Sequence, residues 1–167
     1  MKDSNKIRLH SKEGFYKVFI IKLEGILSLE TDNLANLSNS AAFIFNNLEG
    51  INWAGFYIMR DNELVLGPFG GKVACTRINI EKGVCGAAAR EKMTQLVENV
   101  HLFEGHIACD SDTNSEIVIP IIDGDRVLAV LDIDSPLFNR FDEIDKLYLE
   151  KVVLLLRKYI DFGCISN

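Results

Sequence analysis

The stretch IVIPIIDGDRVLAVLDI, residues 117–133, decides the fold of this chain of 167 residues. It consists of two apolar, largely β-branched runs, 117–122 and 127–133, on either side of Asp123-Gly124-Asp125-Arg126. Such near-continuous apolar runs are typical of strands that are buried on both faces, and the residues between them favour a tight turn. The stretch therefore predicts an antiparallel hairpin at the centre of a sheet.

Helices and further strands flank this hairpin. Apolar residues recur at helical spacing in three segments, namely 15–29, 32–48 and about 142–162. Four segments have a composition typical of strands, namely 53–59, 63–69, 75–80 and 94–97. We expect a short helix over 83–93, Asp142 as the N-cap of the last helix, and a break of the second strand at Pro68 and its neighbouring glycines. This order predicts an α+β fold, a central antiparallel sheet with helices packed on one face and ligand-binding loops on the other.

Length and composition limit the classes of protein to which the chain can belong. It is 48% apolar and 25% charged, so it can bury a full core. We expect an N-terminal extension (1–14), a single domain (15–162) and a C-terminal tail (163–167). The net charge of -6 opposes nucleic-acid binding. Because no apolar run is long enough for a signal core or a membrane span, the sequence predicts a cytoplasmic protein without a membrane partner.

The region 99–115 has no hydrophobic period and is rich in polar residues, which is typical of a functional loop. It contains Cys109, which among the cysteines at 75, 85, 109 and 164 is the best candidate for a reactive thiol. Its acidic neighbours Asp110 and Asp112 would raise the thiol pKa, so a thiolate here needs backbone N–H groups or a protonated carboxyl beside it. His101 and His106 lack the spacing of metal ligands, and we expect no metal.

A second group of candidate residues consists of Glu116, Asp132 and Asp134. Strand periodicity places Asp132 and Asp134 on one face. A simple two-residue turn at Asp123-Gly124 would place Glu116 on the opposite face. Like carboxylates cluster only where a cation or a shared proton offsets their repulsion. We therefore predict that a bulge or a three-residue loop brings Glu116 onto their face, or that Glu116 still belongs to the preceding loop.

Trp53 and Tyr57 lie on one face of the strand 53–59, with Gly55 leaving a gap between the two rings. Buried aromatic rings are most simply core residues, but the indole N–H of Trp53 needs a hydrogen-bond acceptor wherever it is buried. The pair is therefore either part of the core or the wall of a ligand site.

Five segments, in one order and spacing along the chain, resemble those of free methionine-R-sulfoxide reductases, enzymes that are built on a GAF domain. The segments are NWAGFY (52–57), LVLGPFGGKVAC (64–75), GVCG (83–86), GHIACDSDTNSEIVIP (105–120) and VLDIDSP (130–136). The resemblance implies a GAF-like domain that reduces free L-methionine-(R)-sulfoxide to L-methionine by thiol chemistry. It also implies that no cofactor is needed and that electrons come from thioredoxin or a similar dithiol.

The same resemblance implies a role for each cysteine. Cys109 would attack the sulfoxide sulfur and become a sulfenic acid, and Cys75 would resolve this acid as an intramolecular disulfide. Cys85 is either a backup resolving thiol or a small packed side chain. Cys164 lies outside the family pattern and is expected to be a bystander.

The remaining candidates match the family's substrate-binding residues. Glu116, Asp132 and Asp134 would surround the ammonium group of the free amino acid, and one protonated acid could protonate the departing oxygen. Trp53 and Tyr57 would border the methyl group of the substrate. The alternative function is a non-catalytic GAF sensor that binds a small molecule, and exposed apolar positions on the end helices are compatible with a homodimer.

Overall fold

The computed structural model describes residues 11–105 and 110–166. In chain order its elements are α1 (Lys12–Leu27), α2 (Asn33–Asn47), β1 (Trp53–Arg60), β2 (Glu63–Gly71), β3 (Arg77–Asn79), α3 (Gly83–Glu91), β4 (Gln95–Val97), η1 (Val100–Leu102), β5 (Ser115–Asp123), β6 (Arg126–Ser135), α4 (Glu143–Tyr159) and α5 (Phe162–Ser166). The expected helices and strands are all present, with bounds that differ by a few residues. Asp142 caps α4 as predicted, since its side chain accepts hydrogen bonds from the first-turn N–H groups.

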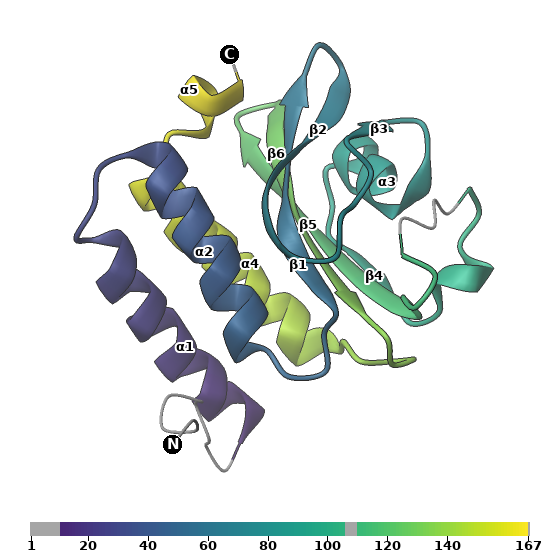
Figure 1. Cartoon of the computed structure of the whole chain (residues 1–167), viewed down its shortest axis with the longest axis horizontal. Coiled ribbons are helices and arrows are strands. Elements are labelled where there is room, and N and C mark those ends of the chain that lie inside the picture. The colour runs from purple at the N-terminus through teal and green to yellow at the C-terminus, as the bar shows by residue number, and fades with distance from the viewer. Residues whose placement is uncertain (1–10, 106–109, 167) are drawn as a thin grey trace.

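The strands of the described chain form one antiparallel sheet in the order β3-β2-β1-β6-β5-β4. β6 lies at the centre of the sheet, between β1 and β5, and β5 is flanked by the short edge strand β4, so both strands of the predicted hairpin are internal but only β6 is central (Figure 1). Most residues of β5 and β6 are buried, as expected of strands that are covered on both faces.

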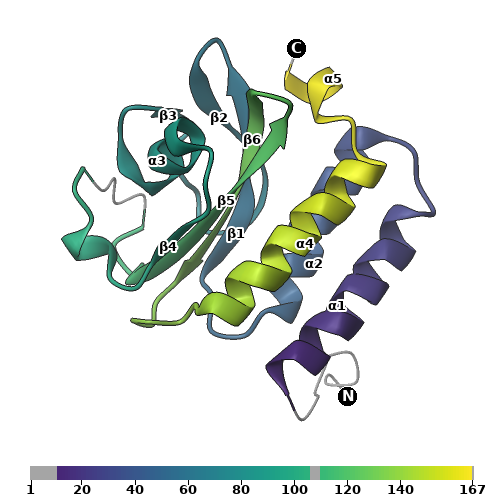
Figure 2. The ribbon, with the colours of Figure 1, turned by 180° about the vertical axis from the view of Figure 1, so that it is seen from behind.

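The two faces of the sheet are covered differently. α2 and α4 lie against one face and α1 packs onto both helices, enclosing the larger part of the hydrophobic core (Figure 2). The second face carries α3 and connecting loops around a smaller core that includes Tyr57, Val118 and Val130. The predicted fold class is confirmed with one addition, because α3 lies on the face that was expected to carry only loops. Within the described ranges, each helix is too short or too polar to cross a membrane.

Three segments differ from the expected boundaries. The Ser11 side chain caps α1, so this helix begins at Lys12, inside the segment that was expected to be an extension. The segment that was expected to be a tail is mostly the short helix α5. The predicted break at Pro68 is wrong, since β2 continues to Gly71. Its glycine-rich end still pairs with β1, through a register shift next to Gly55.

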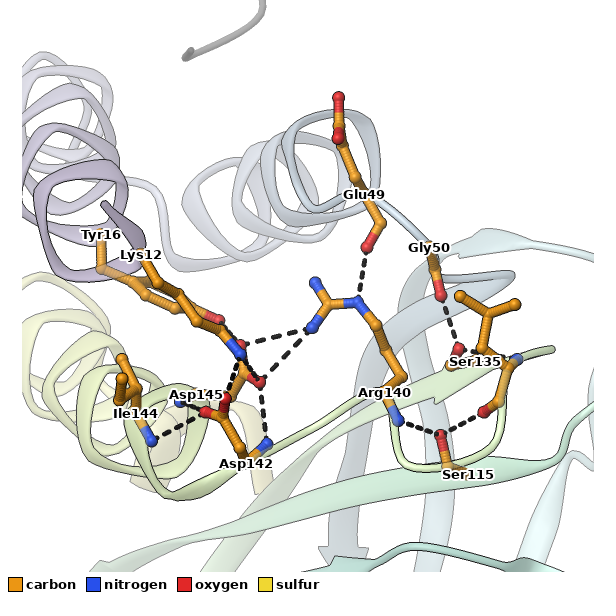
Figure 3. Close-up of polar contacts among 11 residues, drawn as sticks. Lys12, Tyr16, Glu49, Gly50, Ser115, Ser135, Arg140, Asp142, Ile144 and Asp145 are labelled. Atoms are coloured by element: carbon orange, nitrogen blue, oxygen red, sulfur yellow. Dashed lines mark hydrogen bonds and ion pairs between the residues drawn. The ribbon is translucent and has the colours of Figure 1, made fainter. Parts of the chain in front are cut away.

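A buried polar network ties the helices to the ends of the central strands (Figure 3). Asp145 is fully buried, accepts a hydrogen bond from the Tyr16 hydroxyl at 2.6 Å and pairs with Arg140 at 3.4 Å. The backbone N–H of Arg140 donates to the hydroxyl of Ser115, the first residue of β5. The network therefore anchors the strand end that carries Glu116, from the face opposite its side chain.

Candidate functional site

A pocket opens on the second face of the sheet, between β1, β5, β6 and the start of α3. It has a free volume of about 40 Å³, which is room for roughly three water molecules. The site residues predicted from the sequence that line it are Trp53, Tyr57, Cys85, Glu116, Asp132 and Asp134. The fold thus brings together six predicted residues from four elements. Cys109 lies outside the described residues.

The carboxylates share one face of the sheet because of a bulge. β5 and β6 join through a two-residue turn, whose register alone would turn Glu116 away from the aspartates. The register shifts between Ile121 and Ile122. Beyond this shift Glu116 pairs directly with Asp134, and Asp132 lies two residues away on the same face. Of the alternatives predicted from the sequence, the bulge is therefore the one that places all three carboxylates on one face.

Burial shifts the pKa values of these carboxyl groups upward. Desolvation is the largest cause for all three. It raises the pKa of Asp132 to about 6, and it raises those of Glu116 and Asp134 well above the ordinary value of a carboxyl group. Repulsion by Asp132 adds to the shift of the other two, whereas hydrogen bonds from Cys85 and Glu116 hold the pKa of Asp132 lower. The cluster therefore holds its protons to higher pH than isolated carboxyl groups do.

One oxygen of the cluster has room for a further partner. Asp132 is only 6% exposed, and its Oδ1 atom has no hydrogen-bond partner among the described residues. A buried carboxylate oxygen without a donor is costly. Because Asp132 lines the pocket, a cation or a donor bound there would remove this cost.

Trp53 and Tyr57 form an aromatic wall, with their ring centroids 5.8 Å apart and the rings nearly parallel. Gly55 makes this stack possible, since a Cβ atom there would lie 2.6 Å from the Trp53 ring. The Trp53 indole N–H donates to the Lys72 carbonyl at 3.1 Å, and the Tyr57 hydroxyl donates to the Cys75 carbonyl at 3.0 Å. The rings therefore belong to the core and also hold the segment 72–75 against the pocket.

The described cysteines occupy three different environments. Cys75 is partly buried and disulfide-bonded. Cys85 is a free thiol at the start of α3, only 3% exposed, and is hydrogen-bonded to Asp132. Burial raises the pKa of the Cys85 thiol well above its ordinary value. Cys164 is a free, exposed thiol in α5. Cys85 is thus a packed side chain, and it also touches the carboxylate cluster.

The outer rim of the pocket carries a cation that the sequence did not identify as a site residue. Lys72 pairs with Asp112 at 2.5 Å and with Asp110 at 3.3 Å. The N–H of Asp112 and the Lys72 ammonium group lower the pKa of Asp110. Of the described residues that line the pocket, Lys72 alone is positively charged. Its only signal in the sequence is its position three residues before Cys75.

Three buried side chains lie close enough together to hold a metal ion. The ligand atoms of Cys85, Glu116 and Asp132 all lie within 4.8 Å of one another. This set could not be recognised from spacing, because the residues lie on three elements. Of the two histidines considered from the sequence, His101 contacts an asparagine through Nε2 at 2.8 Å, and His106 lies outside the described residues.

Comparison with known proteins identifies the family. The GAF domain family matches residues 35–157. The free methionine-R-sulfoxide reductase of Escherichia coli (strain K12) is 45% identical over 150 residues, covering 90% of this chain and 91% of its own. The free methionine-R-sulfoxide reductase of Saccharomyces cerevisiae is 44% identical over 156 residues, covering 89% of this chain and 87% of its own. The structure of free methionine-R-sulfoxide reductase from Neisseria meningitidis in complex with its substrate covers 100% of both chains, with a TM-score of 0.90 and 37% identity. The chain therefore belongs to the free methionine-R-sulfoxide reductase family, oxidoreductases built on a GAF domain.

Proposed function

We propose that this protein reduces free L-methionine-(R)-sulfoxide to L-methionine through a cysteine sulfenic acid and an intramolecular disulfide. Thioredoxin or a similar dithiol is the final reductant, and no cofactor takes part. Membership of the family supports the reaction. The observation that carries the proposal is the cluster of two buried carboxyl groups, Glu116 and Asp132, and the half-buried Asp134 in a pocket beside an aromatic wall.

The cluster suits the ammonium group of a free amino acid. An ammonium group donates up to three hydrogen bonds and offsets the repulsion between the carboxylates, and Asp132 Oδ1 is an acceptor in the right place. A methionine sulfoxide residue within a polypeptide has an amide at this position. The carboxylates would then remain without a cation, at a cost of several kcal/mol. The site therefore selects the free amino acid.

Cys109 and Cys75 carry the redox steps. The Cys109 thiolate attacks the sulfoxide sulfur, the oxygen passes to Cys109, and methionine leaves. The Cys75 thiol then condenses with the sulfenic acid to a disulfide and releases water, and the external dithiol reduces this disulfide. Cys75 is disulfide-bonded in the structure, whereas Cys85 is a free, buried thiol. This difference supports Cys75 as the main resolving thiol.

The acidic residues around Cys109 oppose formation of a thiolate, and two features offset them. Lys72 pairs with both Asp110 and Asp112. Burial and neighbouring charge raise the pKa of Glu116, which favours the protonated, neutral form of this carboxyl group. A protonated carboxyl group in the cluster can also act as the general acid that protonates the oxygen leaving the sulfur.

The pocket has to widen when the amino acid enters, because its free volume of about 40 Å³ suits only a few water molecules. Residues 71–73 of the outer rim are exposed. The ion pair between Lys72 and Asp112 joins side chains that are 62% and 63% exposed, and such pairs are weakly stabilising. The rim is therefore the part of the pocket that opens at least cost.

Location and assembly follow from the proposed chemistry and the surface. A cycle that depends on reduced thiols and a dithiol donor belongs in a reducing compartment, and we place the protein in the cytoplasm. Large apolar side chains are exposed on α1, α2 and α4, among them Ile21, Leu34 and Leu154. We propose that they contribute to a homodimer interface, which sedimentation analysis would detect.

The decisive experiment is an assay with the separated diastereomers of free methionine sulfoxide and a dithiol reductant. We expect wild-type protein to reduce only the free R form, Cys109→Ser to be inactive, and Cys164→Ser to match wild type because this thiol is exposed and outside the pocket. The same sulfoxide in a peptide should not react. Binding of the amino acid without turnover by wild-type protein would refute the proposal and favour the sensor.

A further inference from the structure

We propose that Cys85, Glu116 and Asp132 form a binding site for a thiophilic divalent cation such as Zn²⁺, and that the bound metal excludes the substrate. The ligand atoms, one sulfur and two carboxylate oxygens, lie within 4.8 Å of one another. Zinc binds sulfur at about 2.3 Å and carboxylate oxygen at about 2.0–2.2 Å. The three atoms therefore converge on a sphere of the right size after small movements of the side chains.

Two further observations support a ligand at this position. Asp132 is almost fully buried and its Oδ1 atom has no hydrogen-bond partner among the described residues, although it lines the pocket. The free volume of about 40 Å³ beside it accommodates an ion with a water molecule. Three protein ligands with one open position are the usual arrangement of a non-structural zinc site.

The charge balance favours a divalent cation over an empty site. The pocket gathers the carboxyl groups of Glu116, Asp132 and Asp134 around the Cys85 thiol, and the described lining residues include one cation, Lys72, which is paired at the rim. Metal binding releases the thiol proton of Cys85 and any proton held by the two carboxyl groups into solvent, and forms one metal–sulfur and two metal–oxygen bonds. The soft thiolate selects Zn²⁺ or Cd²⁺ over Mg²⁺ or Ca²⁺, which prefer oxygen ligands.

Competition with the substrate rests on the proposed function, because the same carboxylates would bind the ammonium group of the amino acid. Two cations cannot share Glu116 and Asp132 without strong repulsion. Zinc would therefore raise the apparent KM and leave kcat unchanged. Binding of the metal itself does not depend on catalysis and can be measured separately.

The test uses Cys75→Ser/Cys109→Ser protein, because the two thiols of the proposed cycle are themselves metal ligands. In this background Cys85 and Cys164 are the cysteines that remain. Cd²⁺ is added while the ultraviolet absorption of the cadmium–thiolate bond is recorded, and the affinity for Zn²⁺ is measured against a chromophoric chelator. We expect one ion to bind per chain and the absorption band of the cadmium–thiolate bond to appear. Adding Cys85→Ala should remove the band and weaken binding by about tenfold or more.

Cys164→Ala in the same background is the matched control and should leave both readouts unchanged, because this thiol is exposed in α5. Asp132→Asn provides a second test that keeps the thiol and the shape of the side chain, and it should weaken binding to a similar degree. Circular dichroism confirms that each variant is folded. A thiolate band that survives Cys85→Ala, or one that is lost with Cys164→Ala, would overturn the site.

The competition arm uses wild-type enzyme in an assay with a phosphine reductant, which does not chelate zinc as dithiols do. Competitive inhibition that a chelator reverses is the expected result. Metal binding without inhibition would overturn exclusion of the substrate while leaving the metal site intact. An enzyme that does not turn over would contradict the proposed function alone, since the cadmium titration would still report the site.

Discussion

Gly55 is the position at which the pocket wall is most sensitive to a single methyl group. It pairs with Phe69 on β2 and with Asp132 on β6. A Cβ atom added at Gly55 would lie 2.4 Å from Phe69 Cβ, 2.6 Å from the Trp53 ring and 2.9 Å from Phe69 Cα. The last of these is a backbone atom, so the clash cannot be relieved by a change of rotamer. We therefore expect Gly55→Ala to displace both the Trp53 ring and the edge of β2.

These distances set the size of the expected losses of stability and of activity. Forcing an extra carbon into a packed core costs about 1–3 kcal/mol, which in a chain of this size lowers the melting temperature by about 2–12 °C. The ring must retreat by about 1 Å to reach ordinary contact distance, and a displacement of that size in a substrate-binding wall can lower kcat/KM by about 10–100-fold.

Gly25→Ala is the matched control. Gly25 lies on the exposed side of α1, and an added Cβ atom would have no heavy atom within 4 Å. Alanine is favoured over glycine in a helix by roughly 0.5–1 kcal/mol, so this variant should melt slightly higher and retain full activity. The two variants are compared by thermal unfolding and by steady-state kinetics with the free sulfoxide. A Gly55→Ala protein with wild-type stability and kcat/KM would refute the reasoning.

Four further outcomes are expected. KM for the amino acid should rise as the pH falls through about 6, because Asp132, whose pKa burial raises to about 6, then loses the charge that binds ammonium; a KM independent of pH from 5 to 8 would contradict this. Burial raises the Glu116 pKa above its unfolded value, so wild-type stability is lost as the pH rises through the folded value. Glu116→Gln should therefore melt higher than wild type near pH 8, lose this advantage below about pH 4, and bind substrate more weakly. Cys75→Ser should complete one turnover and stop at a sulfenic acid that a trapping reagent labels, with excess small thiol restoring cycling; uninterrupted turnover with thioredoxin would show that Cys85 resolves instead. Lys72→Met should slow disulfide formation after the first turnover, since its ion pairs join the segment before Cys75 to Asp110 and Asp112; Lys72→Arg should restore the rate, and equal rates in all three proteins would exclude the effect.

The sequence predicts the strands of the site and the faces of their residues, because period-two geometry is local. Asp132 and Asp134 share a face for this reason, as do Trp53 and Tyr57. The position of Glu116 is different, since it depends on the register between two strands. The sequence could state only that clustered carboxylates require a bulge or a longer loop. The structure supplies the bulge, between Ile121 and Ile122.

Other features of the site could not be predicted, because they depend on contacts between distant segments. The ion pairs of Lys72 join residues about 40 positions apart, and no pattern in the sequence marks them. The hydrogen bond between Cys85 and Asp132 arises from the packing of α3 on the second face of the sheet. That packing was not expected, since the sequence predicts only loops on this face. The predicted strand break at Pro68 failed for a related reason, because pairing with β1 outweighed the local signals of proline and glycine.

The carboxylate cluster explains why stability and binding are opposed at this site. Glu116 and Asp132 are buried and Asp134 is half-buried on the pocket face of the sheet, and desolvation raises the pKa of all three carboxyl groups, so the fold disfavours their ionised forms. A hydrophobic substitution would relieve this cost, but it would also remove every acceptor for an ammonium group. Anything that binds the folded state alone stabilises it by mass action, and a cation does so most where negative charge is least compensated. The three acidic residues therefore lower the stability of the ligand-free protein. The same residues make a cationic ligand, whether an amino acid or a metal ion, bind at this cluster and not elsewhere on the acidic surface.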